Sequence, residues 1–343
     1  MRKTPTVKDV AVEAGVSVGT VSRVIAGEAA VRPALREKVN EAIAKLGYRP
    51  NVTARALRTS KTDVIGLVVP DITNPFFAQL AASVERAALE AGHMVMLASS
   101  HEDLEAEQGH ILAFLDRSVR GIIVVASNGN SDLEIDAPVP IISLDRRFGS
   151  YPLVSTDHAQ AASLVVDHLY ALGHRRIAYI AGPPETEAGR MRRKGFVDRA
   201  QQLSEAGEEI ELEIVAGRFD YESGERAARA LLAREPGDRP TAIAAASDQQ
   251  AIGALRAARD FKVDVPDELS VAGFDDITLA KLVVPRLTTV RQPTERLAAR
   301  AVERLLDQNS PDEDEMVEGS LIVRRSTGPA PGRGASPEER PEA

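Results

Sequence analysis

The sequence predicts a small all-helical headpiece followed by an α/β core of two doubly wound parallel-sheet lobes. Apolar residues recur at helical spacing through residues 1–50. From Asp63 onward, short apolar runs alternate with amphipathic segments, which is typical of buried parallel strands separated by helices. These runs form two successive series, so we expect two similar lobes with a cleft between them.

The composition is that of a globular protein with ample core. A chain of 343 residues has room for two or three domains, and 43% of its residues are hydrophobic. The absence of cysteine excludes disulfides, thiolate metal sites and a cysteine nucleophile. The basic N-terminus lacks the apolar stretch of a secretory signal, and no apolar run approaches the ~20 residues of a membrane span. We therefore expect a cytoplasmic protein without a membrane partner.

The charge is unevenly distributed along the chain. The net charge is −9, yet residues 1–61 contain twelve Lys or Arg and five Asp or Glu, which gives them +7 and leaves −16 for the rest. A basic head on an acidic body suggests that the head binds a polyanion. A solvated basic surface is the alternative that charge alone leaves open.

Helix start and stop residues divide the headpiece into three helices. Thr6 and Asp9 have the spacing of a capping box, and Gly15 is a typical helix stop. Ser17 can cap a second helix, and a third is expected from Pro33 until a glycine that follows Leu46. Two helices joined by a short glycine-containing turn and braced by a third form a helix-turn-helix arrangement.

Residues 51–62 are interpreted as a hinge helix and linker between headpiece and core. Pro50 interrupts regular structure, and Asn51 can cap a helix that ends near Arg58. Isolated helices shorter than about 12–15 residues are marginal in water, so we expect this one to form only when something packs on it. Leu57 stands between basic residues, which a plain linker would not need. Burial of Leu57 against the core is the alternative.

The core pattern also suggests domain boundaries. We expect the core over residues 63–325, with residues 63–158 and 290–322 in the first lobe and 159–288 in the second. Beyond it, residues 326–343 are rich in Pro, Gly and charge and are expected to be disordered. The predicted strands of the two series are 64–69, 94–99, 121–126 and 141–145, then 176–182, 213–217, 242–247 and 269–275.

Signatures of catalysis are missing from the sequence. It contains no glycine-rich phosphate loop after a strand, no HExxH and no G-x-S-x-G elbow, and its six histidines do not fall at metal-ligand spacing. Carboxylates do stand at strand ends, where ligands of open α/β sheets bind, but a binding cleft needs them as much as an enzyme does. We therefore expect a binding protein rather than an enzyme, with no metal and no cofactor.

Several segments resemble the lactose/galactose repressor family of bacterial transcriptional regulators. They include "TVKDVAVEAGVSVGTVSRVIAG" (6–27), "LGHRRIAYIAGP" (172–183), "LSVAGFDD" (269–276) and "LTTVRQP" (287–293), in the order and spacing of the family over about residues 5–325. The resemblance implies a homodimer that binds double-stranded DNA at a pseudo-palindromic operator, usually as a repressor. It also implies a core similar to periplasmic sugar-binding proteins, with a small-molecule effector in the cleft.

The resemblance also implies which headpiece residues meet DNA. The second helix would enter the major groove, where Arg23 is the residue best suited to read a guanine, a phosphate contact being the alternative. Leu57 would be a wedge in the minor groove that kinks the duplex. Ala26 stands where family members commonly carry Asn. The full set of candidate DNA-binding residues is Thr6, Ser17, Val18, Gly19, Thr20, Ser22, Arg23, Asn51, Ala54, Leu57 and Arg58.

In the cleft, the resemblance selects aromatic and charged residues from both lobes. Aromatic faces with carboxylates and an arginine suit a sugar or another polyhydroxylated ligand. Arg190 or Arg193 could replace Arg192 in this role, and each aspartate could instead be a structural helix cap. The candidate effector-binding residues are Phe76, Phe77, Asp145, Arg192, Phe219, Ser247, Asp248, Asp275 and Gln292.

These features suggest allosteric control. Ligand binding would change the closure of the lobes, which would favour or melt paired hinge helices and so set operator affinity. A sugar-binding transport protein and an architectural DNA-binding protein without effector control are the alternatives.

Overall fold

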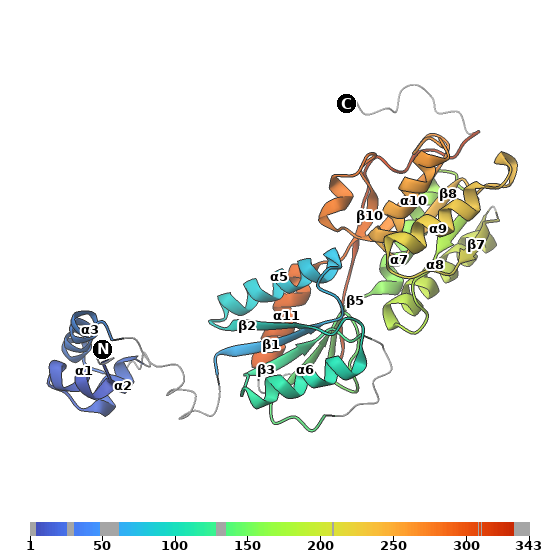
Figure 1. Cartoon of the computed structure of the whole chain (residues 1–343). Helices are drawn as coiled ribbons and strands as arrows, with labels where there is room; N and C mark the ends of the chain where they lie inside the picture. The colour runs from blue at the N-terminus through green and yellow to red at the C-terminus, as the bar shows by residue number, and fades with distance from the viewer. Residues whose placement is uncertain are drawn as a thin grey trace. The chain divides into compact units, whose positions relative to one another are not determined.

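The computed structural model describes residues 5–25, 31–48, 62–127, 135–207, 209–307, 309 and 311–332 (Figure 1). The chain divides into two compact units, Met1–Thr62 and Asp63–Ala343, which contain the headpiece and the core. The predicted fold class is confirmed, since the headpiece is helical and the core holds two parallel-sheet α/β lobes. The predicted hinge helix over residues 51–58 lies outside the described residues.

The headpiece consists of α1 (Val7–Ala14), α2 (Val18–Ile25) and α3 (Pro33–Leu46). The predicted capping box starts α1, because the Asp9 N–H donates to Thr6 Oγ1 at 3.4 Å and the Thr6 N–H donates to Asp9 Oδ2 at 2.7 Å. Gly15 has φ +65°, the left-handed conformation in which glycine ends a helix without strain. The three helices bury a small core that includes Val10, Val21 and Val39.

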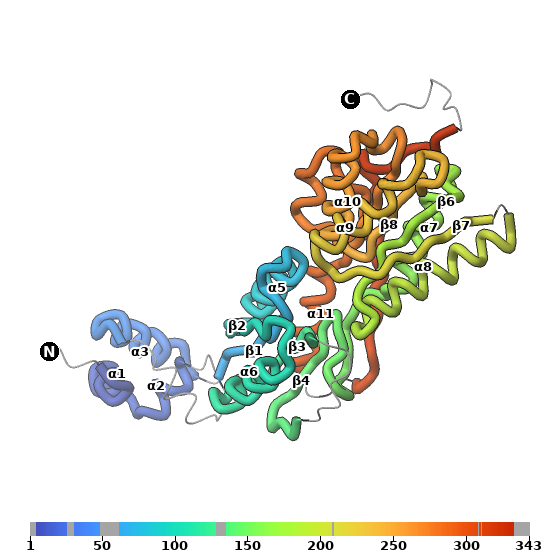
Figure 2. Tube along the Cα trace, turned by 45° about the vertical axis from the view of Figure 1, so that its right-hand side comes forward, coloured from blue at the N-terminus to red at the C-terminus, as the bar shows by residue number. Residues whose placement is uncertain are grey.

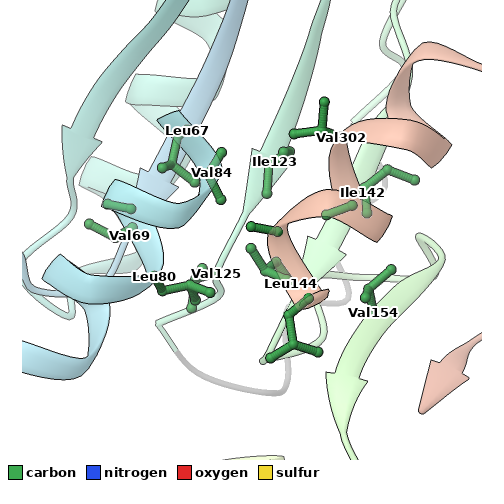
Figure 3. Close-up of a cluster of buried hydrophobic side chains, with 14 of the residues drawn as sticks. Leu67, Val69, Leu80, Val84, Ile123, Val125, Ile142, Leu144, Val154 and Val302 are labelled. Atoms are coloured by element: carbon green, nitrogen blue, oxygen red, sulfur yellow. The ribbon is translucent and has the colours of Figure 1, made fainter. Parts of the chain in front are cut away.

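The first lobe contains a six-stranded parallel sheet in the order β11-β5-β4-β3-β1-β2. Figure 3 shows how Leu80 and Val84 of one helix and Val302 of another pack against strand residues such as Leu67 and Ile123. A third helix covers the opposite face, so the sheet is doubly wound. The strands are β1 (Val64–Val69), β2 (Met94–Ser99), β3 (Gly121–Val124), β4 (Ile141–Leu144), β5 (Leu153–Thr156) and β11 (Glu315–Val317), and the helices α5 (Pro75–Glu90), α11 (Thr294–Leu306) and α6 (Leu104–Asp116).

The second lobe repeats this plan with the order β12-β10-β9-β8-β6-β7, in which β12 alone of the named strands is antiparallel to its neighbour. Two helices cover each face, α7 with α8 and α9 with α10 (Figure 2). Its elements are β6 (Arg176–Ile180), β7 (Glu211–Val215), β8 (Ala242–Ala245), β9 (Ser270–Asp275), β10 (Thr288–Arg291), β12 (Ser320–Ile322), α7 (His158–Ala171), α8 (Glu187–Ala206), α9 (Tyr221–Leu232) and α10 (Asp248–Asp260), with short 3₁₀ turns at Pro236–Asp238 and Thr278–Lys281.

The chain passes between the lobes three times within the described residues. The crossovers are Asp157, residues 292–293 and residues 318–319, each between an element of one lobe and an element of the other. The lobe boundaries differ here from the expected ones, which placed residues 290–322 in the first lobe. β10 and β12 both belong to the second sheet, because Thr289 pairs with Ile322.

The C-terminal segment up to Gly332 also differs from the expected disorder. Thr327 Oγ1 is hydrogen-bonded to His168 Nε2 at 2.9 Å, and the Ala330 N–H donates to the Leu172 carbonyl at 2.9 Å. His174 Nε2 donates to the Gly328 carbonyl at 3.0 Å. Disorder was expected because this segment is rich in Pro, Gly and charge. Its backbone groups nevertheless find hydrogen-bond partners on the folded surface, and these order the segment up to Gly332. Residues 333–343 lie outside the described residues.

The burial of His174, which is hydrogen-bonded to this segment, should make the free energy of unfolding depend on pH. Burial lowers the pKa of His174 to about 4. The unfolded-state pKa is about 6.5, so the folded chain binds fewer protons between these values. The stabilisation is therefore complete above about pH 6.5 and is lost as the pH falls to about 4, by up to about 3 kcal/mol.

We expect urea unfolding of the wild type to show this loss between pH 7 and pH 4, and His174→Asn to show a smaller one. His101→Asn changes an exposed histidine and should retain the wild-type slope. Equal slopes for His174→Asn and the wild type would contradict the assignment.

Candidate nucleic-acid interface and ligand cleft

The outward surface of α2 carries small and polar side chains around one arginine. Ser17, Val18, Gly19 and Arg23 are exposed, and Thr20 is half-buried. Ser17 Oγ accepts the Thr20 N–H at 3.1 Å and so caps the helix. Arg23 Nε donates to the Gly19 carbonyl at 3.4 Å, which holds the side chain along the helix surface. A helix that presents a cap serine and an exposed arginine is suited to the major groove.

The remaining candidate DNA-binding residues are found in two places. Thr6 is exposed at the start of α1, and Ser22 is half-buried on α2. Ala26 and the hinge residues Asn51, Ala54, Leu57 and Arg58 lie outside the described residues.

The core has a polar cleft of about 470 Å³ at the carboxyl ends of its strands, which we call the vestibule. Loops that follow β1, β4, β6 and β7 contribute to it, as expected for ligand sites of doubly wound sheets. Its lining includes Asp71, Glu102, Arg146, Glu185, Arg218 and Asp220, with Phe219 and Tyr221 as aromatic members.

A second, nearly filled space of about 10 Å³ shares Asn74, Arg146 and Phe219 with the vestibule, and we call it the inner pocket. Its volume is about that of one water probe. Six of the nine candidate effector-binding residues line it: Phe76, Phe77, Asp145, Arg192, Phe219 and Asp275.

Arg192 is the arginine that points into this pocket. Its Nη1 donates to the Ala246 carbonyl at 2.7 Å and lies 3.2 Å from Asp275 Oδ1. Its Nε donates to His158 Nδ1 at 3.3 Å, and its guanidinium lies 3.9 Å from the centre of the Phe274 ring. The alternatives Arg190 and Arg193 are both exposed.

Burial dominates the electrostatics around Arg192. It raises the pKa of Asp275 to about 6, although Arg192 and a hydrogen bond from Gln292 favour the charged form. Burial likewise raises the pKa of Asp145 and lowers that of His158 well below its ordinary value. Asp145 has φ +61° and Asp275 φ +124°, so both carboxylates sit on strained backbone, which is common at functional sites.

The other three candidates are buried and are not among the residues that line either space. Ser247 Oγ accepts the Gln250 N–H at 3.3 Å and caps α10. Asp248 accepts the Ile277 N–H at 2.8 Å and is buried. Gln292 Oε1 accepts from Thr156 Oγ1 at 2.8 Å, and Gln292 Nε2 donates to Asp275 at 2.8 Å. These residues support the site, and Gln292 connects the lobes at a crossover.

Sequence reasoning missed Arg146, which stands at the boundary of the two spaces. Its Nη1 donates to the Ser127 carbonyl at 3.1 Å and lies 3.5 Å from Glu102 Oε1. Its guanidinium lies 4.9 Å from the Phe77 ring centre and 5.8 Å from that of Phe219. Its position directly after the strand-end Asp145 was the available signal.

Comparisons with known proteins agree with this architecture. Residues 6–51 match the family described as bacterial regulatory proteins, lacI family, and residues 166–327 match the periplasmic binding protein-like domain. The chain is 36% identical to catabolite control protein A of Priestia megaterium, covering 92% of this chain and 95% of that protein. It is 35% identical to the ribose operon repressor of Halalkalibacterium halodurans, covering 88% and 90%.

Solved structures give the same result. The lac repressor dimer bound to operator and the anti-inducer ONPF has a TM-score of 0.80 at 29% identity, covering 95% of this chain and 100% of that one. The complex of the transcriptional regulator CelR with cellobiose has a TM-score of 0.66 at 33% identity, covering 94% and 99%.

A helix-turn-helix headpiece joined to a two-lobed ligand-binding core defines a ligand-responsive DNA-binding regulator. The chain belongs to the lacI family of bacterial regulatory proteins. It is a transcriptional regulator whose operator affinity is under allosteric control. Among the described residues, no helix is long and apolar enough to span a membrane.

Proposed function

We propose that this regulator represses transcription in the cytoplasm by binding a pseudo-palindromic operator as a homodimer, and that a sugar in the core cleft controls its operator affinity. The observation that carries the proposal is the occurrence, in one chain, of an arginine-bearing α2 surface and a cleft with buried carboxylates and aromatic rings. The lac repressor dimer bound to operator and the CelR–cellobiose complex support it by similarity. We propose that the protein is a regulator without enzymatic activity.

On the DNA side, we assign the base-reading role to Arg23 and a contact with a thymine methyl to Val18, with close backbone approach at Gly19. The hydroxyl residues of the headpiece contact phosphates. Leu57 wedges into the minor groove, flanked by Ala54 and Arg58. The proposed phosphate contacts are Thr6, Ser17, Thr20 and Ser22. The hinge residues besides Leu57 are Asn51, Ala54 and Arg58.

On the ligand side, Asp145, Asp275 and Arg192 bind hydroxyl groups, and the phenylalanine rings contact the apolar face of the sugar. Contacts between the lobes carry the signal. Besides the Gln292–Thr156 bond, the Thr278 N–H donates to Gln79 Oε1 at 2.6 Å, joining the second lobe to α5. A ligand that prefers one degree of closure shifts the balance of these contacts.

Gel-shift titrations with palindromic and random duplexes, each repeated with a panel of sugars, test this function. We expect tight binding to a subset of palindromes and a change in affinity with at least one sugar. Equal binding to all sequences would contradict specific regulation, and operator binding that no sugar alters would contradict sugar control.

Arg23→Ala should remove the preference for one base pair. Loss of a bidentate contact to guanine costs about 1–3 kcal/mol of discrimination. Phosphate contacts remain, so weaker, salt-dependent binding persists. The measurement compares the operator with its single-base variants across a salt series. If Arg23→Ala weakens binding equally to every variant, Arg23 is a phosphate contact.

Gly182→Ala should weaken ligand binding. A methyl group at Gly182 would lie 2.4 Å from Phe219 Cε1, so the ring must shift at the boundary of vestibule and inner pocket. Overpacking of this kind costs about 1–3 kcal/mol, so we expect ligand affinity to fall about tenfold. Calorimetry with a sugar that alters operator binding in the gel-shift titrations measures this loss. Gly237→Ala is the control, since nothing lies within 4 Å of its added methyl. Unchanged affinity in Gly182→Ala would remove Phe219 from the site.

The homodimer forms through the exposed apolar side chains of β2, which we call the β2 patch: Met94, Met96 and Leu97. β2 is an edge strand, and these residues are 72%, 36% and 45% exposed. An exposed apolar edge strand favours association, and a second copy of the chain is its proposed occupant.

A further inference from the structure

The cleft contains more open space than a single sugar ring at the candidate residues requires. The inner pocket, which those residues line, is nearly filled, whereas the vestibule measures about 470 Å³. Clefts of about 300–1,000 Å³ hold drug-sized ligands. The boundary residues Asn74, Arg146 and Phe219 belong to both spaces. A ligand at the boundary can therefore extend into the vestibule.

Two buried polar atoms, one in the inner pocket and one at this boundary, lack a hydrogen-bond partner among the described residues. Asp145 Oδ1 accepts no hydrogen bond, although His158 Nε2 lies 3.6 Å from it, and Arg146 Nε donates none; the two residues are adjacent after β4. Leaving such groups unpaired is unfavourable, so a ligand that satisfies both gains affinity. A hydroxyl group both donates and accepts, which suits one unit of a carbohydrate at this position.

The vestibule itself is rich in carboxylates. Its described lining contains four carboxylates and two guanidinium groups. Each arginine pairs with one acid: Arg146 Nη1 lies 3.5 Å from Glu102 Oε1, and Arg218 Nε lies 3.7 Å from Asp220 Oδ2. No described cation pairs with the two remaining acids, Asp71 and Glu185. Asp71 accepts the Thr73 N–H at 2.8 Å. A surplus of acceptors with net negative charge favours hydroxyl donors and disfavours anions.

Resting on the proposed function, we propose that the effector is an uncharged carbohydrate of two or more units. One unit satisfies Asp145 and Arg146 at the boundary, and the next lies in the vestibule against Tyr221, whose ring is half-buried there. A free monosaccharide leaves the vestibule empty. A sugar phosphate brings negative charge towards Asp71 and Glu185.

Calorimetry on the full-length protein tests this with matched probes: glucose with cellobiose, maltose, trehalose and glucose 6-phosphate; galactose with lactose and melibiose; xylose with xylobiose; and ribose with ribose 5-phosphate. We expect a disaccharide to bind at least about tenfold more tightly than its component monosaccharide, and the phosphates to show no binding. A monosaccharide that binds as tightly as its disaccharides, or a phosphate that binds best, overturns the inference and leaves sugar control intact. If no carbohydrate binds or alters operator affinity, both fail.

Variants of the vestibule give a second measurement. Tyr221→Ala should weaken disaccharide binding about tenfold and leave the monosaccharide unchanged, because only the second unit contacts this ring. Equal weakening of both overturns the placement of the units. Asp71→Asn combined with Glu185→Gln should allow the sugar phosphate to bind, and continued exclusion overturns the charge argument. Glu235→Gln, an exposed acid outside the cleft, should behave as the wild type.

Discussion

Replacing Arg192 by methionine should lower the free energy of unfolding of the core by about 3–5 kcal/mol, as expected when one partner of a buried ion pair is removed. Arg192 is 3% exposed and its guanidinium contacts Asp275, His158 and the Phe274 ring. Methionine fills similar space but leaves the Asp275 carboxylate buried without its cation. Urea unfolding measures the loss, and Arg193→Met, at an exposed neighbouring arginine, is the matched control.

The pH dependence of this loss identifies its cause. The pKa of Asp275 is already about 6 in the presence of Arg192. Without the guanidinium, the pKa of Asp275 rises further. The variant is therefore destabilised most at pH values above about 6, where the wild-type Asp275 carboxylate is ionised. The deficit of Arg192→Met should therefore be larger at pH 7 than at pH 5. An identical deficit at both values would assign it to lost packing. A deficit no larger than that of Arg193→Met would show that the buried ion pair adds nothing to stability.

The double variant Met94→Lys with Leu97→Lys should convert the dimer to monomer and weaken operator binding by about 10²–10⁴-fold. Two lysines in the β2 patch must be desolvated when two copies meet, which opposes association. A monomer engages one half-site at a time and so loses the gain from linked binding. Sedimentation equilibrium and gel shift measure the two effects.

Val323→Lys is the control for this variant. Val323 is 57% exposed but directly follows β12 of the second lobe, outside the β2 patch. It should remain dimeric with wild-type operator affinity. A dimeric double variant would contradict the assignment of the interface to β2, and a monomeric one with full operator affinity would contradict the need for a dimer.

Local sequence signals predicted the elements of the fold well. The Thr6 capping box and the glycine at position 15 are interactions among close neighbours in the chain, and they are present as expected. The apolar runs predicted the other eight strands, most of which are buried on both faces and therefore consist of continuous apolar residues. Four strands were not predicted, β5 and β10 with four residues each and β11 and β12 with three, and the pairing of Thr289 with Ile322 depends on tertiary structure.

The candidate site was predicted less completely, because chemistry alone does not separate a ligand contact from a structural one. Asp145 and Asp248 both follow apolar strands, yet Asp145 has an unpaired oxygen in the inner pocket whereas Asp248 receives the Ile277 N–H. A cleft between the lobes was predicted, but apart from Phe219 none of the candidate residues lines the vestibule. Its members, such as Asp71, Glu185 and Tyr221, come from separate loops and share no periodicity that a sequence could display.

The three crossovers limit how this core can be divided or recombined. Residues 63–156 alone lack α11 and β11, so a contiguous fragment omits part of the first lobe. A protease that cuts one crossover leaves the lobes covalently joined through the other two. Exchange of one lobe between relatives therefore requires coordinated breakpoints at Asp157, residues 292–293 and residues 318–319. Grafting a new ligand specificity is simpler through substitutions in the vestibule loops, which leave all three connections untouched.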